Sequence, residues 1–225
     1  MYQIVTGPLL WLAFIVFFAG LIIHVVLYIK GLDWKLDRVT YSVNVAYGTK
    51  GALRSILYWL IPFGTRSWRV NSGFTITVFV FHICLLFTPV FLKAHNMIFK
   101  ERWGLSLWTL PESLSDMMTI AVMVCVLFLI LRRIALPEVR IISTLYDYLL
   151  LAVTVAPFIT GFFAYHHVLD YDFWLIAHII TGEIMLIAIP FTKLSHIVLF
   201  FLSRAQLGMD YGIKRGGMKS KGLNW

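Results

Sequence analysis

Five long apolar segments dominate the chain, and polar, aromatic and charged residues gather between them. Each segment has about the 20 apolar residues that a helix needs to cross the hydrocarbon core of a bilayer. The pattern therefore predicts an all-α, polytopic membrane protein built as a five-helix bundle. The expected helices cover residues 8–30, 73–95, 116–134, 141–165 and 173–203, within a single membrane domain, 1–225.

Lysine and arginine are concentrated in alternate connections. The 31–72 connection, the 132–140 turn and the 204–225 tail are basic, whereas 166–172 has two aspartates and no lysine or arginine. Because basic connections stay in the cytoplasm, we expect the N-terminus outside and the 31–72 connection and the tail inside. This orientation agrees with five spans, because an odd number of crossings puts the two termini on opposite sides of the membrane.

The composition excludes an ordinary soluble domain, since 60% of the 225 residues are hydrophobic and only 13% are charged. The net charge of +8 comes mainly from the basic connections that are expected on the cytoplasmic side. The charge therefore indicates membrane topology, and we expect no nucleic-acid partner. The first apolar segment lacks an A-x-A cleavage site and is expected to be a retained helix. Cys84 and Cys125 are too few for an iron–sulfur cluster and are interpreted as small core residues.

Two connections have alternative interpretations. Ala52–Phe63 is apolar with a basic start, so it could lie flat in the cytoplasmic interface or dock a cytoplasmic partner. The 96–115 loop contains Trp103 and Trp108, which suit an aromatic belt or a lid over a quinone.

The last apolar segment contains two histidines, His178 and His196, eighteen residues apart. Eighteen residues make five turns of one continuous helix, which would place both imidazoles on one face, about 27 Å apart along the axis. A histidine inside a membrane segment indicates a functional site. Two at different depths predict two stacked haems with axial histidine ligands.

Because the expected helices 73–95 and 173–203 run antiparallel, their histidines can be paired by their depth in the membrane. His82 would pair with His196 on the inner haem. His95 would pair with His178 on the outer haem. Pro89 is expected to kink the helix and turn His95 towards the outer site, because thirteen residues alone leave it about 140° away from His82 around the helix. The rivals for the outer ligand are His166 and His167, and the rival for the inner ligand is His24.

Other residues are candidates for contacts to haem or for proton transfer. Basic residues at the inner level could hold haem propionates, although topology also explains them, and small residues could admit the porphyrin or pack helices. A buried acid could relay protons for quinone chemistry, or be a neutral hydrogen-bonded acid. Asp147 is expected to cap a local network. The candidates are Arg132, Arg133, Arg140, Lys193, Gly161 and Gly182 for haem, and Glu183, His166 and His167 for proton relay or quinone.

Three motifs resemble the gamma (cytochrome b) subunit family of respiratory nitrate reductase, over the second to fifth apolar segments. They are FHI at Phe81–Ile83, RRIALPEVR at Arg132–Arg140 with Asp147, and His178 with PFTKLSHI at Pro190–Ile197. The resemblance implies five helices that hold two b haems, with electrons leaving the inner haem for a cytoplasmic iron–sulfur subunit and quinol oxidised near the outer one.

Carried over residue by residue, the resemblance implies that His82 and His196 hold the inner haem and that His178 supplies half of the outer site. The family's second histidine on this helix comes ten residues after the first, where this chain has Leu92. His95 must replace it, or the outer site is altered.

The opening residues, GPLLWLAFIVFFAGLI and then YIKGLDWKLDR, are similar to the nitrate-reductase-gamma-like cytochrome b subunits of sulfate reducers' transmembrane redox complexes, namely the high-molecular-weight cytochrome complex and its tetrahaem relative. This likeness implies a multi-pass protein of the bacterial inner membrane. The implied partners are a periplasmic multihaem cytochrome c, other membrane subunits, a cytoplasmic iron–sulfur subunit and membrane lipid.

The sequence thus predicts a dihaem b-type cytochrome subunit of a respiratory oxidoreductase, with two haem b. It would carry electrons between a periplasmic cytochrome or a menaquinol pool and the cytoplasmic iron–sulfur subunit, in either direction, and a quinone site would make it catalytic. The alternative is a haem-free membrane anchor or transporter whose histidines relay protons or bind a metal. A third interpretation is a self-contained quinone reductase.

Overall fold

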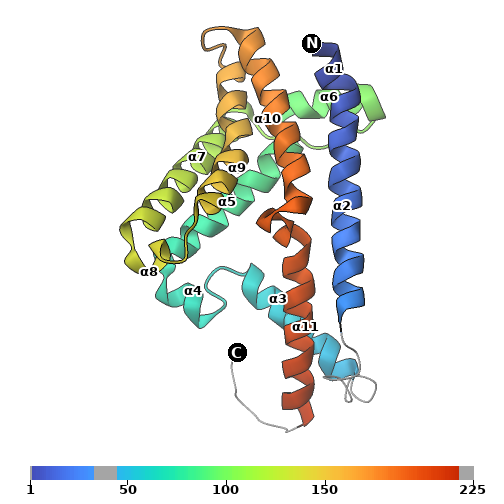
Figure 1. The fold of residues 1–225 in the computed structure, drawn as a ribbon, viewed down its shortest axis with the longest axis vertical. Helices are drawn as coiled ribbons and strands as arrows, with labels where there is room; N and C mark the ends of the chain where they lie inside the picture. The colour runs from blue at the N-terminus through green and yellow to red at the C-terminus, as the bar shows by residue number, and fades with distance from the viewer. Residues whose placement is uncertain (1, 33–44, 218–225) are drawn as a thin grey trace. The chain divides into compact units, whose positions relative to one another are not determined.

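The computed structural model describes residues 2–32 and 45–217, with backbone alone for 212–217. Most of these residues are helical, and no strand occurs among them (Figure 1). Two expected segments lie partly outside the described residues, namely 33–44 of the 31–72 connection and 218–225 of the tail. The described end of the tail is helical as far as Gly217.

Five helical segments of the described chain are long and apolar enough to cross a membrane, and the described residues contain no strand, which confirms the expected all-α fold. Much of their surface stays uncovered by the chain itself, including large side chains such as Ile15, Phe18 and Ile22 on the first span. In a bilayer, lipid covers such faces. The spans are Tyr2–Gly31, Ser72–Phe91, Glu112–Ala135, Leu145–Tyr165 and Tyr171–Phe191.

Short turns and helices connect these spans. In chain order the described elements are α1 (Tyr2–Ile4), a π-helical turn (Val5–Leu9), α2 (Leu10–Gly31), α3 (Val45–Leu60), α4 (Arg66–Val70), α5 (Ser72–Phe91), α6 (Lys93–Trp103), α7 (Glu112–Ala135), α8 (Pro137–Arg140), α9 (Leu145–Tyr165), α10 (Tyr171–Phe191), a 3-10 turn (Lys193–Ser195) and α11 (His196–Gly217).

Two compact units make up the fold. The first consists of Met1–Trp11 and Gly73–Met185. Its core lies where α5, α7 and α9 meet, and both cysteines are free and buried there, as expected. The buried residues of this core are Phe81, Cys84, Val122, Cys125, Val126 and Phe158.

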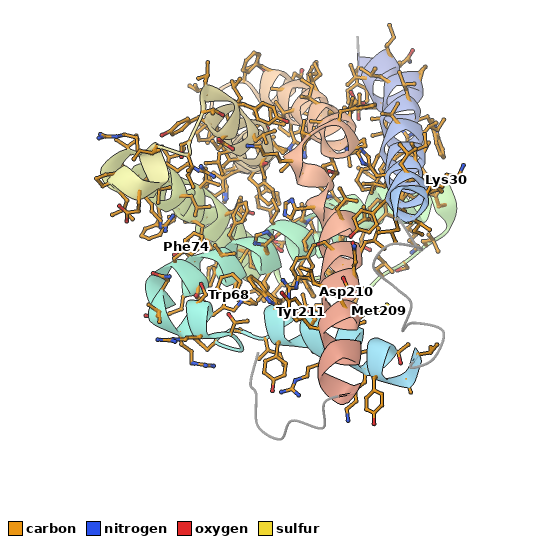
Figure 2. All side chains as sticks on the ribbon, turned by 60° about the horizontal axis from the view of Figure 1, so that its bottom comes forward. Lys30, Trp68, Phe74, Met209, Asp210 and Tyr211 are labelled. Carbon is orange, nitrogen blue, oxygen red and sulfur yellow. The ribbon has the colours of Figure 1, made fainter. Side chains whose placement is uncertain are left out.

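The second unit consists of Leu12–Ser72 and Leu186–Trp225. In it α3 packs along α11, and the helices run antiparallel with a close approach at Gly208. A Cβ atom on Gly208 would lie only 2.4 Å from the backbone oxygen of Gly51, so a residue without a side chain is needed there. Figure 2 shows Met209, Asp210 and Tyr211 following on α11.

Arg204 of α11 contacts two residues of α3. Its guanidinium donates two hydrogen bonds to the Ser55 hydroxyl, at 3.1 and 2.9 Å, and lies 4.7 Å from the ring centroid of Trp59. Burial lowers the pKa of Arg204. One face of Ala52–Phe63 is thus packed on α11, while Leu53 and Leu57 are exposed.

The expected helix over 173–203 is two helices in the structure, which corrects that prediction. α10 ends at Phe191 and α11 begins at His196, with the 3-10 turn Lys193–Ser195 between them. Eighteen residues make five whole turns only in an unbroken helix, so that rule does not place His178 and His196 on one face.

Two residues explain the interruption. Pro190 has no backbone N–H, and its ring crowds the carbonyl one turn earlier, so it weakens the helix near its end. Thr192 then takes an extended conformation, with φ −129° and ψ −178°, and its hydroxyl accepts a hydrogen bond from the Leu194 N–H at 3.2 Å. This N-cap starts the next helical segment.

The expected helix over 73–95 also ends early, at Phe91. Leu92 is extended, with φ −66° and ψ 131°, and α6 begins at the next residue. Residues 96–103, expected to be loop, are therefore helical. The expected cap at Asp147 is confirmed, because its carboxylate accepts hydrogen bonds from the backbone N–H and the hydroxyl of Thr144, at 2.9 and 3.0 Å.

Candidate functional site

The first unit brings together His95 from α6 and His178 from α10. Their ring centroids are 5.8 Å apart and their ring planes are inclined by 21°. Two imidazoles that bind one metal ion through Nε2 hold their centroids roughly 6 Å apart, because metal–imidazole bonds are about 2.0–2.1 Å long. The observed separation is therefore close to that of a shared axial pair.

His95 reaches this position because of the break between α5 and α6. Its Nδ1 lies 2.8 Å from the carbonyl oxygen of Pro89, in the last turn of α5. That oxygen is available because Leu92 is extended, which ends α5. No backbone N–H of a further turn of α5 therefore donates to the Pro89 oxygen. Burial lowers the pKa of His95, which favours the neutral imidazole that can bind a metal.

His178 is positioned by a glycine on the neighbouring helix α9. Its Nδ1 lies 2.8 Å from the carbonyl oxygen of Pro157. A Cβ atom on Gly161 would lie 2.8 Å from that Nδ1 and 2.9 Å from Cε1, so the imidazole fills the room that the missing side chain leaves. At Gly182 a Cβ atom would meet nothing within 4 Å. Porphyrin contact at either glycine stays a prediction.

All four histidines expected to be ligands share one arrangement at Nδ1. The Nδ1 of His82 lies 2.8 Å from the Val78 carbonyl oxygen, and that of His196 lies 2.9 Å from the Lys193 carbonyl oxygen. A carbonyl oxygen only accepts, so each Nδ1 carries the proton and each Nε2 carries the lone pair. This is the tautomer that metal-bound histidines need.

The inner pair belongs to two different units. His82 is in the first unit and His196 in the second. Their pairing on one haem stays a prediction. His82 is half-buried beside the ring of Phe81, with centroids 5.2 Å apart, and His196 is exposed at the start of α11.

The two rivals for the outer ligand lie elsewhere. The Nε2 of His166 is 3.3 Å from a carboxylate oxygen of Asp116, and the ring of His167 stacks on Tyr171 with centroids 4.8 Å apart. Both histidines are exposed just beyond α9. The structure pairs neither of them with His178 by any described contact.

The basic candidates lie at or beyond the ends of helices. The Arg132 guanidinium lies 4.2 Å from the ring centroid of Phe74. Arg133 donates a hydrogen bond to the Ser143 hydroxyl at 2.9 Å. Arg140 ends α8, and Lys193 begins the 3-10 turn; both are exposed. Their contacts to propionates stay predictions.

Glu183 is the most deeply buried carboxyl among the described residues, with 2% of its surface exposed. Neither of its oxygens has a hydrogen-bond partner among the described side chains and backbone. A carboxyl in such a position is costly unless it is protonated or meets a ligand. This isolation within a spanning helix keeps Glu183 a candidate for proton transfer.

The donors present fit a haem better than a bare metal ion. Among the described residues no group of three or more histidine, cysteine, aspartate or glutamate side chains converges as a metal site needs. A haem needs only two axial ligands, since the porphyrin supplies the remaining four. His95 and His178 meet that requirement with their tautomers set and their rings near the right separation.

A comparison with curated proteins finds a relative in Nitratidesulfovibrio vulgaris (strain Hildenborough). The two sequences are 57% identical over 217 residues, which is 96% of this chain and 96% of the relative. The chain belongs to the same family as this relative. The relative is named simply "Protein", so the kinship carries no activity with it. No family profile and no solved structure matches the sequence.

Two residues of the site in this family member escaped the sequence analysis. Asn96 is buried beside His95, with 5% exposed, and the sequence offers no cap pattern that points to it. Thr192, which caps the turn before His196, was also missed, although threonine is a usual N-cap residue. The structure also shows that Gly161 lies against the His178 ring, a contact that no rule of sequence spacing predicts.

Proposed function

We propose that the chain is a dihaem b-type cytochrome subunit of a membrane-bound respiratory oxidoreductase complex. The single observation that carries the proposal is the pair His95 and His178, whose ring centroids lie 5.8 Å apart while each Nδ1 is held by a backbone carbonyl. The resemblance to the nitrate-reductase gamma subunits, which rests on motifs around His82 and His196, supports the second haem.

A bound haem supplies a one-electron carrier whose potential depends on its ligands and surroundings. In this proposal His95 and His178 hold the outer haem, and His82 and His196 hold the inner haem. The backbone carbonyls fix the four imidazole tautomers. In this proposal Arg140 and Lys193, both exposed, would meet haem propionates.

Electrons would pass between a periplasmic multihaem cytochrome or menaquinol outside and an iron–sulfur subunit in the cytoplasm. The composition of residues 45–72 supports an acidic partner or anionic lipid on the inner side, because this segment has four basic residues and no aspartate or glutamate. These basic residues are Lys50, Arg54, Arg66 and Arg69.

Quinol oxidation would require a group that accepts protons close to the outer haem. Glu183 is the candidate for this part of the proposal. It is five residues after His178 on the same helix, about 7.5 Å along the axis and about 140° around it, and it has no hydrogen-bond partner among the described residues. His166, already beside Asp116 at the outer end, could pass such a proton to the surface. A quinone site would make the subunit catalytic.

The experiment is a haem assay on the purified chain. A pyridine haemochrome measurement is expected to give two haem b per chain, with a Soret band that sharpens on reduction. Purification from the native membrane is expected to bring an iron–sulfur subunit along. A colourless protein would contradict the proposal and favour a haem-free anchor or transporter.

A further inference from the structure

The C-terminal end of α5 exposes backbone carbonyls that the chain satisfies in an unusual way. A helix end leaves its last carbonyls without intrahelical partners, and inside a membrane protein such groups must be paired. Here two neighbouring side chains of α6 pair them. The His95 ring contacts the Pro89 oxygen, and the Asn96 amide donates to the Val90 oxygen at 3.0 Å. The same amide also donates at 3.2 Å to the Leu92 oxygen, which accepts the Asn96 backbone N–H at 3.0 Å as well.

The same carboxamide also holds the chain that follows α6. The Asn96 Oδ1 accepts a hydrogen bond from the Leu107 N–H at 3.2 Å. Three residues later, the Leu110 N–H donates to the Phe91 oxygen at 2.9 Å. Asn96 therefore ties the end of α5 to the 104–111 segment through three hydrogen bonds, and it is buried while doing so.

We infer that Asn96 is a positioning residue for the outer haem, acting through the angle of the His95 imidazole. The bend at Leu92 is what turns His95 towards His178, and the two donor hydrogens of Asn96 hold the carbonyls on both sides of that bend. Without them the Val90 oxygen loses its side-chain donor and the Leu92 oxygen keeps only the Asn96 backbone N–H, so fewer hydrogen bonds hold the bend beside the His95 ring. This inference rests on the proposed function.

The test compares Asn96→Ala and Asn96→Asp with a neighbouring control, Met97→Ala, in the full-length chain. Ala removes all three hydrogen bonds, whereas Asp keeps an acceptor for Leu107 and loses the amide donors. Met97 is on the same helix and 59% exposed, so its truncation should change nothing. Haem content, the ferric electron paramagnetic resonance spectrum and hydrogen exchange of residues 104–111 are measured.

Support requires three results together. Exchange in residues 104–111 rises in Asn96→Ala and stays near wild type in Asn96→Asp. Both variants change the resonance of one haem, which reports the angle between its two imidazole planes, and leave the other haem unchanged. The affinity for that one haem falls about 10-fold, at the low end of what the loss of an outer-shell support of a metal ligand costs.

Other outcomes overturn the inference. If exchange rises while both haem spectra stay as in wild type, Asn96 is structural only. If no measurement differs from Met97→Ala, or if neither Asn96 variant accumulates with its inner haem, Asn96 does not act by positioning His95. A wild-type chain with fewer than two haems would instead contradict the proposed function, and the hydrogen-exchange result would still stand by itself.

Discussion

The imidazole rings of His95 and His178 have their centroids 5.8 Å apart, although the two residues are 83 positions apart in sequence. Each ring owes its place to a local irregularity. For His95 this is the break at Leu92, and for His178 it is the missing side chain at Gly161. The relationship is specific enough to be tested one residue at a time.

Gly161→Ala is expected to disturb the outer haem alone. The added Cβ would lie 2.8 Å from His178 Nδ1, so the ring must move and its hydrogen bond to Pro157 must lengthen. In a helix interior the same change is otherwise favourable by about 1 kcal/mol, so helix content should not fall. A haem assay with a redox titration measures the effect.

The matched control for that variant is Gly73→Ala, also in a spanning helix of the first unit. A Cβ there meets nothing within 4 Å, so both haems should be unaffected. Equal behaviour of the two alanine variants would show that Gly161 does not position His178.

Gly208→Val is expected to destabilise the second unit. The new side chain would meet the Gly51 carbonyl oxygen at 2.4 Å, and a backbone atom cannot move aside as a flexible side chain can. Overpacking of this kind costs about 1–3 kcal/mol. Thermal unfolding of the purified chain should show a lower midpoint, and Gly31→Ala, at an open position of α2, should not.

Much of this arrangement follows from the sequence, and the rest depends on contacts that no local pattern encodes. Hydropathy located the five spans because lipid exposure requires about twenty apolar residues whatever the neighbours are. The eighteen-residue spacing misled, since it assumed a continuous helix where Thr192 begins a new one. The position of a helix end depends on single capping residues. Hydrophobic periodicity is a property of a whole segment and does not reveal them.

The pairing of His95 could be anticipated only in outline. Pro89 indicated a kink, but the extended residue is Leu92, which carries no break signal of its own. The hydrogen bonds that hold the bend come from Asn96 and from Leu110, which is far along the chain. Such a tertiary arrangement overrides propensity, and a single sequence does not reveal it.

Lys93→Met is expected to leave the outer haem unchanged. Lys93 forms an exposed ion pair with Glu112 at 3.0 Å, and this hydrogen bond and charge raise the pKa of Lys93. A raised lysine pKa contributes stability that is complete below the unfolded value of 10.5 and is lost only as the pH rises past the folded value. Between about pH 6 and pH 8 the contribution of the pair is constant, so the haem spectra of wild type and variant should show no pH-dependent difference in this range.

Exposed ion pairs contribute little to stability because water and salt screen their charges. Adding salt to the wild-type protein gives an independent check of the same point. A loss of the outer haem at high ionic strength would mean that the Lys93 pair, rather than the bend at Leu92, holds His95.

Glu183→Gln is expected to keep both haems and to slow their reduction by quinol. Glutamine has nearly the same shape and is neutral, so the buried position should tolerate it, but it cannot carry a proton. General acid–base groups contribute about 10²–10⁴-fold to rate. Stopped-flow reduction with a menaquinol analogue gives the rate, and reduction by dithionite serves as the control, because it bypasses quinol chemistry. An unchanged quinol rate would remove Glu183 from the proton path.

The most direct measurement is the haem content of His95→Ala, His178→Ala and the double variant, beside His24→Ala as a control. If the two histidines share one iron, each single variant should fall from two haems per chain to one, and the double variant should stay at one. His24→Ala should keep two. Two haems in either single variant, or a further loss in the double variant, would contradict the shared axial pair.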